Sequence, residues 1–335
     1  MKRGWLLLAV MSLMAGAVGT AAFCAQRSGT PAPVYLLRYA ENQPADYPTT
    51  QSAYYFAELV AERTEGAVKI TVYPDGVLGD ESSVIRQVQF GGIDLARVSI
   101  AQLITHSEAL SVLTMPYLYR DNAHMWTVLD GSIGDRFLEE IESAGLLGLS
   151  WYDAGERNFY TQEPIAALDD LRGRVIRVQE ADYMSDMVRV LGAVPKSIPY
   201  NEVYSSLSMG AVDGAENNWP SYEAALHYRV APYVLLDGHV RIPEMQILSA
   251  ETAADLPAEY VKVIQECARE SARYERRLWN EREQSARQRC IDSGVTVTAL
   301  SDAEREKFRS ACQPIYEKYA AEYLDVIAEI QAAGE

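Results

Sequence analysis

The sequence predicts an α/β protein with two lobes and a long helix towards its C-terminal end. Three observations indicate this fold class. Strand and helix patterns alternate in two separate series, between residues 34 and 152 and between residues 171 and 222. One uninterrupted helical pattern then runs from Pro257 to Ser293. With 335 residues, 48% of them hydrophobic, the chain is long enough to bury two cores.

The first series consists of βαβ units, which predict a parallel sheet covered by helices. We assign residues 33–150, with part of 227–335, to lobe 1. The expected elements are strands at Val34–Tyr39, Val68–Tyr73, Leu95–Ile100 and Leu146–Tyr152, and helices at Pro48–Arg63 and Ser82–Phe90.

The second series places polar side chains at a strand end. A β-branched strand at Val175–Val178 is followed by a helix at Ala181–Leu191, a strand through Val194, a helix at Asn201–Met209 and a strand that starts at Val212. The last strand ends in Glu216-Asn217-Asn218-Trp219. Because strand ends in such units border a crevice, we expect a small polar ligand there. We assign residues 151–226, with part of 227–255, to lobe 2.

The chain then returns through two crossing strands at Tyr233–Leu236 and Val240–Ser249. After the long helix, only Val295–Val297 has a strand pattern.

Several motifs resemble the substrate-binding proteins of tripartite (TRAP) transporters of the DctP type. They cover nearly the whole chain after its first residues, and together they are specific. At Gln179 the family usually has proline, and we expect this difference to affect only the strand exit. The matching segments are "FAELV-x-x-R-T-x-G" from Phe56, "V-x-x-YP" from Val68, "LGDE" from Leu78, "GGIDLA" from Gly91, "LGA-x-P" from Leu191, "EVY-x-x-L-x-x-G" from Glu202 and "VDG-x-EN" from Val212.

The resemblance implies a two-lobed, periplasmic-binding-protein-like fold in which the helix at 256–293 bridges the lobes. It also implies that Arg157, Arg177 and Asn217 hold a ligand carboxylate, since their spacings of twenty and forty residues match the family. Arginine suits this task because its planar fork binds a carboxylate through two hydrogen bonds. The alternative for each arginine is a salt bridge to one of the 47 acids.

The remaining candidate ligand contacts come from both lobes. Tyr200 and Trp219 offer aromatic faces, with core packing as the alternative, and several hydrogen-bonding groups surround the expected clamp. Such groups suit a polyhydroxylated acid better than a plain dicarboxylate. Family members with "ENN-W" resemble those that take uronic acids, so we expect a uronate such as glucuronate or galacturonate. The other candidates are Glu41, Asn42, Arg97, Asn218 and His239.

The N-terminus predicts export. Lys2 and Arg3 precede an apolar run and small residues, which is typical of a signal peptide at residues 1–22, and the run is too short to span a bilayer. A lipid anchor at Cys24 is the less favoured alternative to soluble export to the periplasm. The net charge of −17 argues against nucleic acid as a partner.

Cysteines and histidines indicate no catalytic or metal site. Cys267 and Cys290 are too far apart on one helix to bond, whereas Cys290 and Cys312 either form a disulfide or remain buried thiols. We expect no cofactor and no metal, because the four histidines have no metal-binding spacing.

The sequence favours a binding protein over an enzyme. It contains no Gly-x-Ser-x-Gly elbow, no His-Glu-x-x-His and no Walker-type loop. We expect a monomer that binds its acid between the lobes, closes around it and docks on the membrane subunits of a TRAP transporter. The alternatives are a dicarboxylate or other organic acid as ligand, a ligand-presenting sensor and, less favoured, a secreted carbohydrate-active enzyme.

Overall fold

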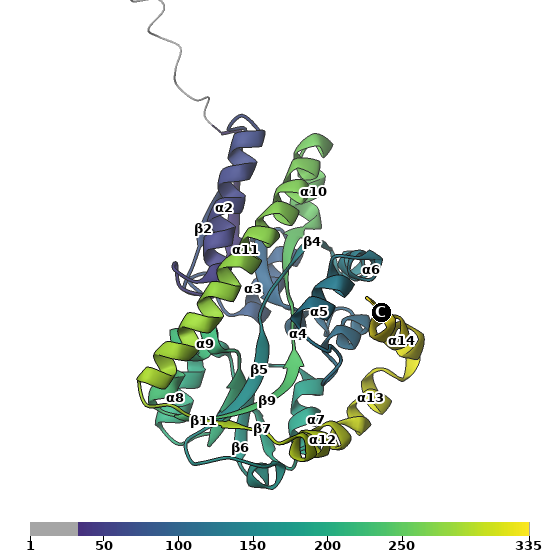
Figure 1. Cartoon of the computed structure of the whole chain (residues 1–335). Coiled ribbons are helices and arrows are strands. Elements are labelled where there is room, and N and C mark those ends of the chain that lie inside the picture. Colours follow the sequence, from purple (N-terminus) through teal and green to yellow (C-terminus); the bar gives the residue numbers. More distant parts are fainter. Residues whose placement is uncertain (1–32, 335) are drawn as a thin grey trace, which may run out of the picture.

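The computed structural model describes residues 33–334 and contains two β-sheets, each at the centre of one lobe (Figure 1). The predicted signal peptide at 1–22 and Cys24 lie outside the described residues. Within residues 33–334, no helix combines the length and the apolar character that crossing a membrane requires.

The sheet of lobe 1 has five strands, in the order β2-β1-β3-β10-β4. β1 runs parallel to β2 and β3, whereas β10 is antiparallel to β3 and β4. The strands are β1 (Tyr35–Ala40), β2 (Val68–Tyr73), β3 (Leu95–Ser99), β4 (Leu146–Tyr152) and β10 (Glu244–Ser249), and the helices of this part of the chain are α2 (Pro48–Arg63), α3 (Glu81–Gln89), α4 (Ile100–Leu103), α5 (Asn122–Leu129) and α6 (Ser132–Glu139).

The sheet of lobe 2 has six strands, in the order β11-β9-β5-β8-β6-β7. β6 is parallel to β7 and β8, and β5 is antiparallel to β8 and β9. The strands are β5 (Glu156–Thr161), β6 (Val175–Val178), β7 (Val194–Ser197), β8 (Gly214–Asn217), β9 (Tyr233–Arg241) and β11 (Thr296–Ala299), and the helices are α7 (Asp182–Val190), α8 (Val203–Ser208) and α9 (Trp219–Ala224).

The chain crosses between the two sheets twice within the strand region. It enters lobe 2 between β4 and β5 and returns between β9 and β10. The two return strands differ from the expected bounds. β9 continues to Arg241, because its polar residues Asp237 and His239 have buried partners, and β10 starts only at Glu244.

Helix α11 (Ala258–Asp292) spans both lobes, as Figure 1 shows. It packs against α2 and β4 at one end and against α9 at the other. Its buried side recurs every three to four residues, at Ile264, Cys267, Ala268, Ser271 and Ala272, which is the pattern of a helix with one face against a core. α10 (Ala250–Asp255) precedes it.

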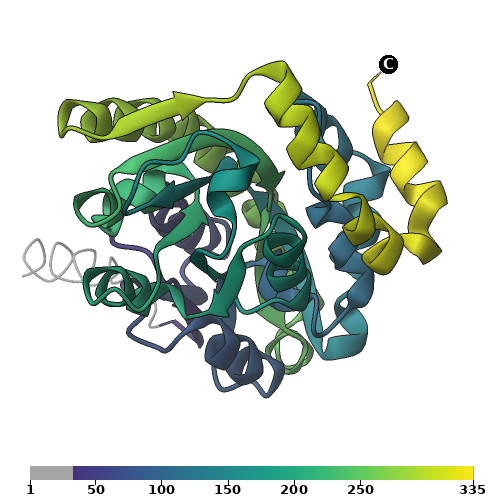
Figure 2. The ribbon, with the colours of Figure 1, turned by 90° about the horizontal axis from the view of Figure 1, so that it is seen from below.

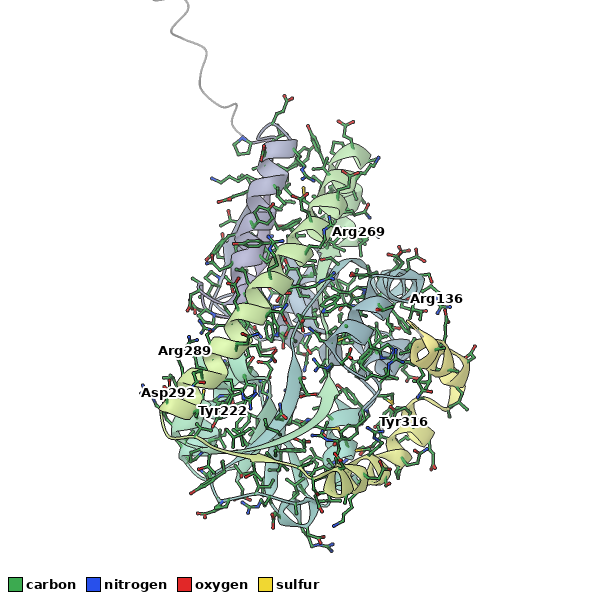
Figure 3. The ribbon with its side chains drawn as sticks, viewed as in Figure 1. Arg136, Tyr222, Arg269, Arg289, Asp292 and Tyr316 are labelled. Atoms are coloured by element: carbon green, nitrogen blue, oxygen red, sulfur yellow. The ribbon has the colours of Figure 1, made fainter. Side chains whose placement is uncertain are left out.

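The chain after α11 visits both lobes. β11 pairs with β9 in lobe 2, although the expected bounds of that lobe ended at residue 255. α12 (Asp302–Ala311), α13 (Gln313–Tyr319) and α14 (Leu324–Ala332) then lead back towards the side of lobe 1, where Figure 2 shows the last helices beside the segment around residues 100–140. Arg136 of α6 pairs with Glu329 of α14 at 2.6 Å (Figure 3).

The disulfide alternative for Cys290 and Cys312 is wrong, because both are buried free thiols. Cys290 packs in the core of lobe 2 beside Tyr222, whereas Cys312 belongs to a different hydrophobic cluster with Phe308. Burial raises the pKa of both thiols to about 12, so neither is a reactive thiolate.

Candidate functional site

Among the residues that the structure describes, Arg177 is a buried cation without a carboxylate partner. It lies on β6 between Ile176 and Val178, and the residue is 2% exposed. Its Nε donates to the carbonyl oxygen of Ile198 at 2.8 Å, but its Nη1 is buried and has no hydrogen-bond partner within residues 33–334. Burial lowers its pKa, because the surroundings do not compensate the lost hydration. A buried guanidinium in this state is suited to receive an anion.

A cavity next to Arg177 lies between the two lobes. The empty volume of the cavity is ≈ 540 Å³, including the part that is open to solvent. Lobe 1 contributes the segments that follow β1 and β2 and the start of α3, and lobe 2 contributes the segments that follow β6 and β7. The lining residues are Asn42, Asp75, Gly76, Gly79, Asp80, Glu81, Ser82, Gln102, Arg177, Gln179, Glu180, Ile198, Pro199, Tyr200 and Asn201.

Arg97 is surrounded by carboxylates and does not line this cavity. Its guanidinium binds Glu41 through two nitrogens, the longer contact being 3.1 Å, and it also binds Oδ1 of Asn42. Its Nη1 lies 3.1 Å from Glu244 and 3.5 Å from Glu81. Arg97 and Glu41, both expected ligand contacts, bind each other and line a small hollow that shares Asn42 and Glu81 with the cavity. Of the three expected contacts Arg97, Glu41 and Asn42, Asn42 lines the cavity itself.

Of the three glutamates around Arg97, Glu81 lines the cavity. Its Oε1 accepts a hydrogen bond from the backbone N–H of Ser99 at 2.9 Å. Burial, and next the charge of Glu244, raise the pKa of Glu81 to about 7. The pKa of Glu244 is also raised, first by burial, although Arg97 acts against it. The two carboxylates thus share one arginine, and each holds a proton more strongly than an ordinary glutamate does.

Arg157 forms a salt bridge with Glu216. A salt bridge was the alternative to ligand binding that the sequence analysis gave for this arginine. Its Nη2 donates to Oε1 of Glu216 at 2.9 Å, and its Nε contacts Oε2. His239 continues this buried network, since its Nδ1 lies 2.7 Å from Asp237 and its Nε2 3.5 Å from Glu216. Neither Arg157 nor His239 lines the cavity.

The pKa values in this network reflect charges held together away from water. Burial alone would lower the pKa of His239, but Asp237 and Glu216 raise it to about 9. Burial would raise the pKa of Glu216, but Arg157 and His239 lower it to about 2. Arg157, Glu216 and His239 are therefore all charged at neutral pH and form a structural support beneath the strand ends.

The polar cluster at the end of β8 has local roles. Oδ1 of Asn217 accepts from the backbone N–H of Asn218 at 2.9 Å. Asn218 caps α9 by accepting from the N–H of Ser221 at 2.8 Å. Trp219 packs against Tyr222 in the core of lobe 2, which was the alternative that the sequence analysis gave for it. The guanidinium of Arg287 lies over its ring. The structure places none of Asn217, Asn218 and Trp219 in the cavity lining.

Tyr200 lines the cavity and joins two parts of the molecule. Its hydroxyl donates to the carbonyl oxygen of Ser221 at 3.1 Å. The hydroxyl of Ser221 in turn lies 2.9 Å from that of Tyr47, which comes from lobe 1. Tyr200 thus provides a cavity wall close to a hydrogen-bonded contact between the lobes.

The sequence analysis named Asn42, Arg177 and Tyr200 among the lining residues and missed the others, of which Gln179 and Glu81 are the most informative. Gln179 is 9% exposed, and its Oε1 has no hydrogen-bond partner among the described residues. The expectation that Gln179 affects only the strand exit is therefore wrong, because this side chain lines the cavity beside Arg177. Glu81 belongs to the "LGDE" motif, so the signal for it was present but had been read as a family marker only.

Comparisons with known proteins show the family and the fold of the chain. The family model described as bacterial extracellular solute-binding protein, family 7 (DctP) matches residues 39–322. A TRAP periplasmic solute-binding protein from Xanthobacter autotrophicus, solved with β-D-galacturonate, is 38% identical, with a TM-score of 0.86 over 89% of this chain and 99% of that one. A Bradyrhizobium protein with galacturonate is 37% identical, with a TM-score of 0.86 and coverages of 88% and 99%. A Pseudomonas putida protein with D-glucuronate is 32% identical, with a TM-score of 0.87 and coverages of 90% and 98%.

Proposed function

Because the chain belongs to the DctP family of bacterial extracellular solute-binding proteins, we propose that it binds a hexuronate such as galacturonate or glucuronate between its two lobes. Members of this family are the solute-binding proteins of TRAP transporters, so the chain is a binding protein and not an enzyme. The single observation that carries the proposal is the unpaired Nη1 of Arg177 beside the cavity between the lobes.

The carboxylate of the uronate pairs with Arg177 in this proposal. A charged acceptor satisfies the buried Nη1 and offsets the cost of keeping a guanidinium away from water. Arg157 stabilises the strands beside Arg177, because its ion pair with Glu216 joins β5 and β8, and β8 is the neighbour of β6. In this proposal, Arg177 alone binds the carboxylate, and the ion pair of Arg157 with Glu216 holds the neighbouring strands in place.

The hydroxyl groups of the sugar meet the polar lining. Glu81, Gln179 and Asn42 offer acceptors and an amide donor, and Tyr200 offers a ring face. A plain C4-dicarboxylate has too few hydroxyl groups to satisfy these side chains, and each buried group left without a partner costs about 1–3 kcal/mol. The polar lining therefore favours the uronate over succinate or malate.

Ligand binding closes the lobes in this proposal, because the two walls of the cavity come from different lobes. The closed form is the one that the membrane subunits of a TRAP transporter recognise. The protein is exported to the periplasm by its N-terminal signal peptide and acts as a monomer.

A thermal-shift screen of the purified protein tests this function. A specific ligand stabilises the folded form by about 2.7 kcal/mol at a concentration one hundred times its Kd. We expect galacturonate or glucuronate to raise the Tm, and succinate and malate to leave it unchanged. A larger shift with a C4-dicarboxylate would contradict the assignment of the ligand class, and no shift with any acid would contradict the binding function.

A further inference from the structure

The cavity carries opposite charges on its two walls. Among the described residues that line it, Arg177 is the single cation, whereas Asp75, Asp80, Glu81 and Glu180 are acids. Arg177 belongs to lobe 2, and the first three of these acids belong to lobe 1. An acid bound with its carboxylate on Arg177 therefore directs its remaining atoms towards a negative wall.

Glu81 is the acid of this wall whose position is held by the fold. It is the first residue of α3, and the N–H of Ser99 binds its Oε1 at 2.9 Å. Its side chain is 13% exposed. The N–H of Ser99 engages only Oε1, which leaves Oε2 as the oxygen for a ligand hydroxyl. Asp80, in contrast, uses both carboxylate oxygens to cap α3 through Ser83.

The charge of Arg97 does not neutralise this wall. Glu41, Glu81 and Glu244 all lie within 3.5 Å of its guanidinium, so one positive charge meets three acids. A second ligand carboxylate in this part of the cavity would find no free cation and would stand next to Glu81. Like charges brought together in a site with little water repel each other, which weakens binding of the second carboxylate.

Resting on the proposed function, we propose that Glu81 restricts the site to acids with a single carboxylate. Glu81 accepts a hydrogen bond from a sugar hydroxyl and repels a carboxylate at the same place. The class of ligand is therefore a polyhydroxylated monoacid, and the diacids that arise when the far end of such a sugar acid is also oxidised are excluded.

The test compares galactonate and galactarate, two open-chain six-carbon acids that differ only in a terminal CH₂OH or carboxylate. Their dissociation constants are measured by calorimetry, directly or in competition with the bound uronate, for the wild type and Glu81→Gln. At pH 8.5, where most of Glu81 is ionised, we expect the wild type to prefer galactonate by about 30-fold, because a bound diacid can at most force Glu81, whose pKa is about 7, to take up a proton. The introduced amide retains an acceptor for the N–H of Ser99, so we expect the variant to fold and to reduce this preference at least tenfold.

Glu202→Gln is the matched control, because Glu202 is an exposed acid next to the lining residue Asn201 but does not line the cavity. It removes the same charge and should leave the preference unchanged. An unaltered preference in Glu81→Gln, an equal change in Glu202→Gln, or a wild type that binds both acids equally would overturn the inference. Failure of the wild type to bind galacturonate and glucuronate would instead contradict the proposed function, and this inference with it.

A second measurement needs no variant. Burial and the charge of Glu244 raise the pKa of Glu81 to about 7, so Glu81 loses its charge between pH 8.5 and pH 5.5. The groups that face it are Arg97 from β3, Glu244 from β10, Glu41 after β1, and Arg177 and Arg157 from lobe 2. The carboxylates of galactonate and of galactarate stay ionised in this pH range. The preference for galactonate should therefore narrow at pH 5.5, and a preference that does not depend on pH would count against Glu81.

Discussion

Three buried arginines near the cavity differ in what they contact. Arg97 meets three carboxylates and Arg157 binds Glu216 through two nitrogens, whereas Arg177 has no carboxylate within 4.0 Å among the described residues. At the residue scale, this difference separates the arginines that hold the fold together from the one that is free to hold a ligand.

The difference predicts that removing Arg157 and removing Arg177 change the stability of the unliganded protein by very different amounts. Arg157→Ala leaves Glu216 buried without its partner, so we expect a loss of about 3–5 kcal/mol in the free energy of unfolding. Arg177→Ala loses one hydrogen bond but also removes a buried charge that no acid compensates, so we expect a change of at most about 1 kcal/mol. Urea denaturation of both variants measures this, and equal losses would contradict the distinction.

The His239 network predicts a loss of stability at high pH. The pKa of His239 is about 9 in the folded protein, against about 6.5 when unfolded. The stabilisation is therefore complete below pH 6.5 and disappears as the pH rises through 9. Denaturation at pH 6.5 and 9.5 should show a decrease of about 3 kcal/mol from this group. The decrease should be absent from His239→Gln, and an identical pH dependence in the two proteins would exclude His239 as its cause.

The sequence could single out Arg177, which the structure places in the cavity lining, but it could not reveal the partner of Arg157. A lone arginine in the apolar strand Val175–Val178 is visible in the sequence itself. The contact of Arg157 with Glu216 depends on the antiparallel register of β5 and β8, in which Phe159 stands opposite Glu216. That register is set by the packing of the whole sheet, and no local pattern contains it.

At the scale of elements, hydrophobic periodicity predicted the strands and helices well wherever one face is buried. The bounds of α2, β2, β4 and β6 are those expected. The expected helix at Asn201–Met209 is shorter in the structure, because Tyr200–Glu202 form a 3₁₀ turn before α8 begins at Val203. This turn places Tyr200 at the cavity, a tertiary contact that propensity alone does not reveal.

The crossing between β4 and β5 packs tightly against α11. Gly155 has a φ of 60°, and a Cβ there would lie 2.7 Å from Oε1 of Glu283 and 3.0 Å from Nε1 of Trp279. Gly173 has a φ of 76° with no atom within 4 Å of such a Cβ. Gly173→Ala should therefore cost only the backbone strain, about 1–2 kcal/mol.

Gly155→Ala should cost this strain and, in addition, about 1–3 kcal/mol for the overlap with α11. Chemical denaturation of the two variants gives the difference. If Gly155→Ala were no less stable than Gly173→Ala, the crossing would not be held against α11 as the structure indicates.

At the scale of the whole molecule, α11 and its ion pairs connect the lobes. Arg282 of α11 contacts Glu223 of α9 at 2.7 Å and Asp46 of lobe 1 at 3.4 Å. Arg289, at the lower end of α11 in Figure 3, contacts the same Glu223 at 2.8 Å. These contacts connect the two lobes along α11. The cavity lies where both lobes contribute lining residues.

The two-lobed fold and the bridging helix followed from the alternating patterns and from the family resemblance, and the structural comparisons confirm them. The return of β11 to lobe 2 was not predicted. The three residues with a strand pattern do not indicate which sheet they join, because the pairing with β9 brings together segments about sixty residues apart.

Calorimetric titration of galacturonate and glucuronate into the wild type and Arg177→Ala tests the central claim most directly. The buried, charge-assisted contact with Arg177 should contribute about 3 kcal/mol or more, so its loss should weaken binding by about 100-fold or more. We predict clear binding of at least one uronate to the wild type and none measurable to the folded variant at the same concentration. Unchanged affinity in folded Arg177→Ala protein would contradict the assignment of Arg177 as the carboxylate-binding residue.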